Sequence, residues 1–101
     1  MTAYKIAVLE GDGIGPEIAA ATRNVLLAVD QKFGLNLELQ NAEIGFRSLE
    51  ASGSTFPDDV LSAAKATDGI LMAPVSTNDY PPEREGGINP SGFLRKNLDL
   101  F

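Results

Sequence analysis

The chain has 101 residues, of which 44% are hydrophobic, and it contains neither cysteine nor histidine. This length allows one domain at most, and the two missing residue types exclude disulfide frameworks, thiol nucleophiles, Ser-His-Asp triads and ordinary zinc sites within it. The net charge of −6 disfavours nucleic acid as a partner, and no apolar run approaches the roughly 20 residues of a membrane span, so we expect a cytoplasmic protein that binds neither.

The first part of the chain predicts a strand, a long helix and a second strand. Tyr4–Leu9 is a short apolar run that stops at a glycine loop, which is typical of a buried parallel strand. From Pro16 the apolar residues recur every three or four positions, which predicts a helix that ends at Gly34. The helix face that we expect to be buried consists of Ile18, Ala21, Val25, Leu26, Val29 and Phe33. Leu35–Gln40 alternates apolar and polar residues, which predicts a half-exposed strand near the sheet edge.

The middle of the chain predicts a loop, a second helix and a third strand. Glycines interrupt the apolar positions of Ala42–Ser54, which predicts a loop that holds a helical turn at most. Pro57–Asp59 begins a helix with two carboxylates in its first turn, and Asp68 and Gly69 end it. Its expected buried face consists of Val60, Leu61 and Ala64. Ile70–Val75 is apolar throughout, which predicts a central strand.

The last part of the chain predicts a long polar loop and a third helix. The loop Ser76–Gly87 leads to Asn89 and Pro90, an N-cap residue followed by a proline at the first helical position. This helix has no C-cap signal, and we expect it to continue to Phe101. The alternation of strands and helices predicts an α/β fold with parallel strands and right-handed crossovers. Three parallel strands leave open edges, so we expect residues 1–101 to belong to a larger domain.

The stretch Val8–Ile18 (VLEGDGIGPEI) places three glycines between the first strand and the first helix. A dinucleotide fingerprint needs glycine at its first, third and sixth positions, but after Gly11 and Gly13 the sixth position is Pro16. The P-loop pattern also fails, because no Gly-Lys-Ser/Thr follows. The stretch therefore predicts a tight strand-to-helix turn rather than a Rossmann phosphate site.

Three stretches together resemble the β-decarboxylating dehydrogenases, the family of the isocitrate and 3-isopropylmalate dehydrogenases. They are VLEGDGIGPEI at Val8–Ile18, TDGILMAPVST at Thr67–Thr77 and FLRKNLDLF at Phe93–Phe101. The resemblance implies an open three-layer α/β/α sheet that is not a Rossmann fold, with residues 1–101 as the N-terminal part of a single large domain. It also implies a homodimer that oxidises and decarboxylates a 2-hydroxy-3-carboxy acid such as 3-isopropylmalate, isocitrate, malate or tartrate. The implied cofactors are NAD or NADP together with Mg²⁺ or Mn²⁺.

The resemblance implies cofactor contacts at four residues. Ile14 would lie against the adenosine, Ser76 and Thr77 would approach the nicotinamide end, and Ile88 falls at a further cofactor position. Hydrogen bonding within the loop accounts for Ser76 and Thr77 equally well. Asp12 would brace the glycine turn, and an Asx-type bond to its own backbone is the alternative.

The resemblance implies substrate contacts on the last helix. Arg95 matches the family's first substrate arginine, whose guanidinium can hold a carboxylate with two parallel hydrogen bonds. The alternative is a surface arginine paired with Asp99. The helix start at Asn89 attracts a carboxylate, and Ser91 is the second polar residue expected there. The isopropylmalate pattern has two leucines where Ser91 and Gly92 stand, so we expect a polar or smaller group on the substrate.

The family's catalytic tyrosine and lysine and its metal-binding aspartates have no counterpart among these 101 residues. We therefore expect no catalytic residue and no metal ligand in this chain, which would be inactive by itself. The residues by themselves leave two hypotheses open. One is a piece of a dehydrogenase, and the other is a non-catalytic α/β fragment or generic nucleotide-binding module.

Overall fold

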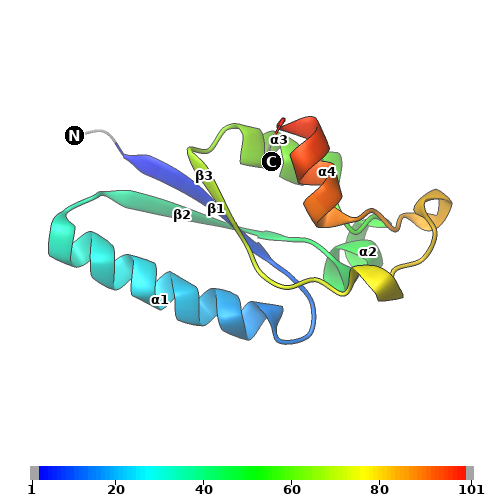
Figure 1. The fold of residues 1–101 in the computed structure, drawn as a ribbon, viewed down its shortest axis with the longest axis horizontal. Coiled ribbons are helices and arrows are strands. Elements are labelled where there is room, and N and C mark those ends of the chain that lie inside the picture. Colours follow the sequence, from blue (N-terminus) through cyan, green and yellow to red (C-terminus); the bar gives the residue numbers. More distant parts are fainter. Residues whose placement is uncertain (1–2, 100–101) are drawn as a thin grey trace.

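The fold is built on a sheet of three parallel strands in the order β2-β1-β3 (Figure 1). The computed structural model of the chain describes residues 3–99. Its elements in chain order are β1 (Tyr4–Glu10), α1 (Gly15–Phe33), β2 (Leu37–Glu43), α2 (Phe46–Ser52), α3 (Asp58–Lys65), β3 (Gly69–Met72), the 3-10 turns η1 (Thr77–Asp79) and η2 (Glu83–Glu85), and α4 (Pro90–Asn97). Because the strands are parallel, their carboxyl ends meet at one edge of the sheet, the edge nearest α2 and η1 in Figure 1.

Helices cover both faces of the sheet, α1 one face and α3 with α4 the other (Figure 1). Successive side chains of a strand point to opposite faces. Val8 therefore packs with Ala19 of α1, whereas Ala7 and Leu9 pack in a separate core that includes Leu94 of α4. All three β1 side chains are buried, which explains why β1 reads as a continuous apolar run. The predicted three-layer α/β/α arrangement with parallel strands is confirmed.

Of the two strand positions predicted from the sequence, β2 at an edge agrees with the described sheet and β3 at its centre does not. β2 lies at an edge, as its alternating pattern indicates, although it begins at Leu37 and ends at Glu43, later than predicted. The central strand is β1, not β3, which pairs with β1 alone within the described residues. β3 ends at Met72, and each of its residues is only half-buried. Apolar composition therefore did not identify the central strand, because it does not specify pairing partners.

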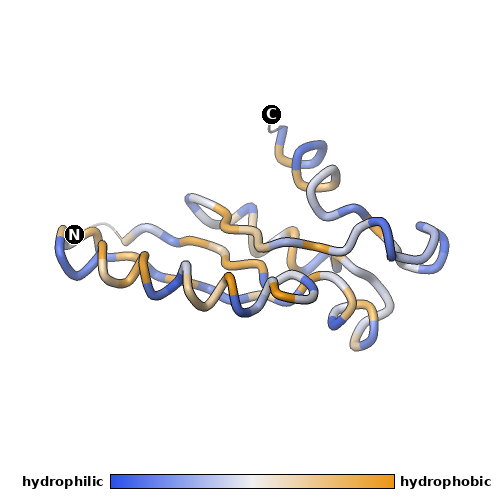
Figure 2. The backbone as a smooth tube through the Cα atoms, turned by 60° about the horizontal axis from the view of Figure 1, so that its bottom comes forward, coloured by the Kyte–Doolittle hydropathy of each residue, from blue (hydrophilic) through white to orange (hydrophobic). Residues whose placement is uncertain are grey.

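Helix α1 has its predicted C-terminal end but not its predicted buried face. Gly34 ends the helix with φ of 64°, as the sequence indicates. Figure 2 shows apolar positions recurring along α1, yet Val25 is 61% exposed and Phe33 66% exposed, and only Leu26 of the predicted face is even half-buried. The helix instead faces the sheet through Ala19, whose small side chain packs with Val8 and Ala73. The periodicity identified an apolar face of α1, but a neighbouring face of the helix packs on the sheet.

Among the remaining elements, one predicted loop contains a helix, and two predicted helices end earlier than expected. The segment predicted as a loop contains the helix α2, which lies between Gly45 and Gly53, both with positive φ. α3 begins after Pro57 as predicted and ends at Lys65. α4 ends at Asn97 rather than continuing to Phe101, which lies outside the described residues. No helix within residues 3–99 combines the length and the apolar character needed to cross a membrane.

Candidate functional site

The loops that follow the three strands converge at the carboxyl edge of the sheet (Figure 1). β1 leads into the glycine turn at Gly11–Ile14, β2 into Ile44 and Gly45, and β3 into the segment 73–80. Open α/β sheets bind ligands outside the carboxyl ends of their strands. The edge therefore brings together three of the predicted cofactor residues, Ile14, Ser76 and Thr77.

The carboxylate of Asp12 connects these three loops. Its Oδ1 accepts a hydrogen bond from the backbone N–H of Phe46 at 2.7 Å. Its Oδ2 accepts from the backbone N–H of Ser76 at 3.0 Å and from the hydroxyl of Tyr80. We call Asp12, Phe46, Ser76 and Tyr80 the Asp12 cluster. Asp12 thus braces the turn by bonding to the two neighbouring loops, and the alternative of an Asx-type bond to its own backbone is wrong.

Two glycines give the Asp12 cluster its space. A Cβ on Gly11 would overlap the carbonyl oxygen of Pro74. The same oxygen accepts a hydrogen bond from the Asp12 N–H at 2.9 Å. Gly45 has φ of 82°, and a Cβ there would overlap the Asp12 carboxylate. These positions require glycine because backbone or a buried carboxylate occupies the place of a side chain. The glycine turn is therefore shaped for contact with the segment after β3 and with the residue before α2, which agrees with the failure of the dinucleotide fingerprint.

Tyr80 is the side-chain donor of the Asp12 cluster. Its ring packs edge-on against Phe46, with ring centroids 5.0 Å apart and planes at 85°. Burial, reinforced by the hydrogen bond and negative charge of Asp12, raises the pKa of the Tyr80 phenol above its ordinary value. The phenol therefore keeps its proton and donates to the carboxylate, while Ser76 and Thr77 lie half-buried in the same segment.

A second set of contacts fixes the start of α4. Thr55 is fully buried, and its hydroxyl both accepts from the N–H of Ile88 and donates to the Ile88 carbonyl, each at 2.7 Å. The Thr55 N–H also donates to the carbonyl of Gly86, and the Thr55 carbonyl accepts from the N–H of Gly45. These bonds link the start of α4 to the carboxyl edge. Ile88, a predicted cofactor residue, is therefore held by its backbone, and it immediately precedes the N-cap Asn89.

Helix α4 presents the predicted substrate residues. Asn89 is the N-cap as predicted, and its Oδ1 accepts from the N–H of Gly92 at 3.3 Å. Ser91 is half-buried and Arg95 is exposed in the last turn of the helix. Residues four positions apart lie on the same side of a helix, so Ser91 and Arg95 face the same direction.

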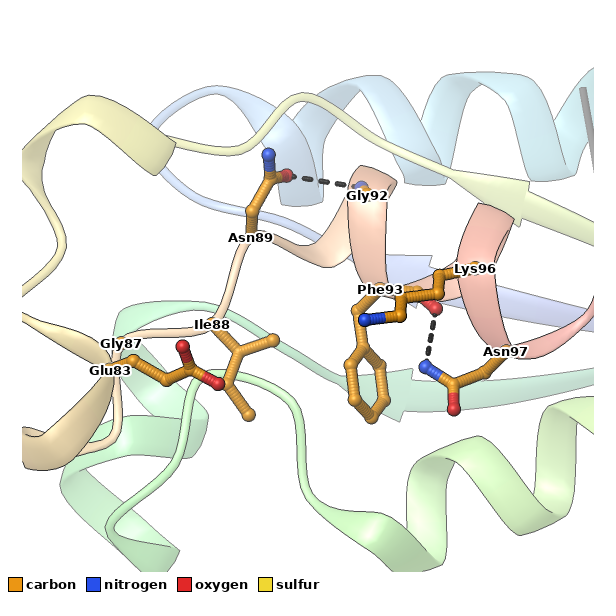
Figure 3. A pocket seen from close by; sticks show the side chains of 8 residues that line it. All are labelled: Glu83, Gly87, Ile88, Asn89, Gly92, Phe93, Lys96 and Asn97. Carbon is orange, nitrogen blue, oxygen red and sulfur yellow. Dashed lines mark hydrogen bonds between the residues drawn. The ribbon is translucent and has the colours of Figure 1, made fainter.

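A pocket of about 500 Å³ lies beside α4 (Figure 3). Its lining residues are Glu83, Gly87, Ile88, Asn89, Gly92, Phe93, Lys96 and Asn97. Of the predicted site residues it contains only Ile88 and Asn89, whereas Ser91 and Arg95 lie outside its lining. The pocket therefore takes in one predicted cofactor residue, Ile88, and one predicted substrate residue, Asn89.

The sequence patterns did not indicate Gly45, Thr55 or Tyr80. Their contacts join residues 33 to 68 positions apart, so no local motif contains both partners. The roles of the seven predicted site residues stay predictions, although their positions are now known. Within residues 3–99, no group of three or more acidic side chains is placed to hold a metal ion.

Comparison with known proteins identifies the family. The family model for isocitrate/isopropylmalate dehydrogenase matches residues 5–101. The chain is 43% identical to a 3-isopropylmalate dehydrogenase of Streptococcus mutans and 45% identical to one of Burkholderia thailandensis, covering 96% of this chain but only 28% and 27% of those proteins.

Solved structures agree with the sequence matches. The fold resembles a β-decarboxylating dehydrogenase from Thermococcus kodakarensis, with a TM-score of 0.78, 29% identity and coverage of 95% of this chain and 27% of that one. It also resembles the isocitrate dehydrogenase of Methylococcus capsulatus, with a TM-score of 0.76, 27% identity and coverage of 95% and 26%. The chain thus spans less than a third of the length of these relatives. With the family model matching nearly all of its residues, the chain belongs to the isocitrate/isopropylmalate dehydrogenase family.

Proposed function

We propose that this chain is the N-terminal part of the large domain of an NAD- or NADP-dependent enzyme that oxidises and decarboxylates a 2-hydroxy-3-carboxy acid. The observation that carries this proposal is the placement of Ser91 and Arg95 one helical turn apart on α4, in a chain of this dehydrogenase family. The exposed Arg95 guanidinium can grip a substrate carboxylate with two parallel hydrogen bonds.

Asn89 supports the same carboxylate-binding role. Its side-chain oxygen accepts from Gly92 as the helix cap, so its NH₂ group is the part that can donate to a ligand. The positive end of the helix dipole at the same place favours negative charge. Asn89, Ser91 and Arg95 thus supply a donor amide, a hydroxyl and a cation from one short helix, which is the chemistry that a polycarboxylate needs.

The residues at the carboxyl edge fit a dinucleotide. Ile14 is 63% exposed next to the start of α1, so an apolar surface is available for an adenosine ring. Ser76 and Thr77 place hydroxyl groups on the loop after β3, and we propose that they bind the nicotinamide end. Ile88, held by Thr55, would complete this set. When bound, the cofactor accepts a hydride from the substrate, and the residues of this chain bind and orient the two molecules.

The described residues do not fit a metal site, because residues 3–99 contain no suitable group of acidic side chains. We therefore assign no metal-dependent step to this chain. The Mg²⁺ or Mn²⁺ requirement belongs to the proposal for the complete enzyme.

Ser91 and Gly92 indicate the substrate class within the family. Glycine has no side chain and serine has a short polar one, so these two positions offer less apolar surface to an isopropyl group than two leucines would. We propose that the substrate belongs to the set 3-isopropylmalate, isocitrate, malate and tartrate, and that Ser91 and Gly92 favour the members of this set whose variable group is polar or small. The family likeness also supports a homodimer in the cytoplasm. Light scattering of the purified protein would test the dimer.

The decisive test is a cofactor-reduction assay on the protein expressed from the complete gene. We expect turnover of at least one acid among isocitrate, malate, tartrate and 3-isopropylmalate, with NAD or NADP and with Mg²⁺ or Mn²⁺. A preference for 3-isopropylmalate would contradict the preference inferred from Ser91 and Gly92. No turnover with any combination would refute the dehydrogenase function and favour a non-catalytic module.

A further inference from the structure

The Asp12 cluster fixes both ends of one short segment. Oδ2 of Asp12 accepts from the Ser76 N–H at one end of the segment and from the Tyr80 hydroxyl at the other. Between them lies the 3-10 turn η1, closed by bonds from Asp79 to Ser76 and from Tyr80 to Thr77. A single buried carboxylate therefore sets the position of the segment that contains Ser76 and Thr77.

The same carboxylate belongs to the turn that presents Ile14. The carbonyl of Asp12 accepts from the Gly15 N–H at 2.7 Å, and its N–H donates to Pro74 at 2.9 Å, so the turn is held from both sides. Ile14 lies two positions after Asp12 in this turn. The spacing between Ile14 and the Ser76–Thr77 segment is consequently set through Asp12.

The hydrogen bond from the Tyr80 hydroxyl is the one bond to Asp12 in this cluster that a point substitution can remove without changing the backbone. The other two donors to Asp12 are backbone amides, which every residue except proline has. The Tyr80 ring is held separately by its edge-on contact with Phe46, so losing the hydroxyl need not displace the ring.

We propose that Tyr80 is a positioning residue for the dinucleotide, which it serves by binding Asp12 and so holding Ser76 and Thr77 at a fixed distance from Ile14. This inference rests on the proposed function, because it assumes that these three residues contact the cofactor. Tyr80 itself does not contact the reacting atoms in this scheme. It acts through the geometry of the loop, so its loss should weaken cofactor binding more than turnover.

The test compares Tyr80→Phe with Tyr4→Phe in the protein expressed from the complete gene. Tyr4 is half-exposed at the amino end of β1, away from the carboxyl edge, so it loses the same hydroxyl without touching the Asp12 cluster. In Tyr80→Phe we expect the Kd for NADH or NADPH and the KM for the oxidised cofactor to rise by about tenfold, whereas kcat changes less than about twofold. Hydrogen exchange of the peptide spanning residues 76–80 should become faster in the same variant.

Asp12→Asn provides a second variant. One carboxylate oxygen becomes an NH₂ group that must face a backbone donor, so cofactor binding should fall at least as much as in Tyr80→Phe. If the wild-type protein binds cofactor and Tyr80→Phe binds it equally well, the positioning role is wrong while the proposed function stands. If the wild-type protein binds neither NADH nor NADPH, the proposed function fails and the positioning role fails with it.

Discussion

Replacing Thr55 by valine tests the contact that fixes the start of α4. Valine has nearly the shape of threonine but lacks the hydroxyl. Thr55 is fully buried, and its hydroxyl makes two hydrogen bonds of 2.7 Å to the backbone of Ile88. The substitution therefore removes the partner of one N–H and one carbonyl at once, while it leaves the packing of the core almost unchanged.

The expected loss of stability follows from the Ile88 N–H and carbonyl, which both lose their hydrogen-bond partner. A buried polar group left without a partner costs about 1–3 kcal/mol. Because Ile88 is half-buried, water can partly replace the lost hydroxyl, so we expect Thr55→Val to lower the free energy of unfolding by about 2–4 kcal/mol in total. Urea denaturation of the purified protein measures this quantity directly.

Two control substitutions separate the hydroxyl from other effects. Thr55→Ser keeps both hydrogen bonds and loses one buried methyl, which should cost about 1 kcal/mol. Thr22→Val removes a hydroxyl that donates to the Ile18 carbonyl in the preceding turn of α1 at 2.9 Å, and it should change stability by less than about 0.5 kcal/mol. A Thr55→Val protein as stable as the wild type, or a Thr55→Ser protein equally destabilised, would refute the assigned role of the hydroxyl.

Three further results are expected. Arg95→Lys should lower kcat/KM for the acid substrate by a factor equivalent to about 1–3 kcal/mol, since lysine cannot form the paired hydrogen bonds. The control Arg84→Lys, on the exposed turn η2, should leave kcat/KM unchanged. Equal kcat/KM values for wild type and Arg95→Lys would contradict carboxylate binding by Arg95. Ala19→Leu should destabilise the fold by about 1–3 kcal/mol through overpacking against the sheet. Val25→Ala should stay within about 0.5 kcal/mol of wild type in urea denaturation, because Val25 is exposed. A larger loss of stability in Val25→Ala than in Ala19→Leu would support the helix face predicted from the sequence. The raised pKa of Tyr80 means that the native state favours the protonated phenol, so this stabilisation is complete below pH about 10 and is lost as the pH rises further. Tyr80→Phe should flatten that alkaline decline in urea denaturation, and an unchanged decline would exclude Tyr80 as its source.

The family resemblance and the boundaries of several elements could be predicted from the sequence because their signals are local. Gly34 ends α1 through its own backbone conformation, and Asn89 caps α4 through a bond to a residue three positions later. Ile14 and Ser76 could be placed in loops that follow predicted parallel strands, because the apolar runs Tyr4–Leu9 and Ile70–Val75 end just before them. The candidate site was predicted only as separate pieces, since nothing in the sequence indicates that Thr55 holds Ile88 or that Gly45 makes room for Asp12.

The turn after β1 could be told from a dinucleotide fingerprint without a structure, because Pro16 occupies the position where the fingerprint needs glycine. The face of α1 that packs on the sheet, the central strand and the groups that bond to Asp12 became known only from the folded chain. The two kinds of feature differ in the range of the interactions that create them. A turn or a cap depends on residues within a few positions of one another, whereas packing and buried hydrogen bonds depend on segments that meet only when the chain has folded.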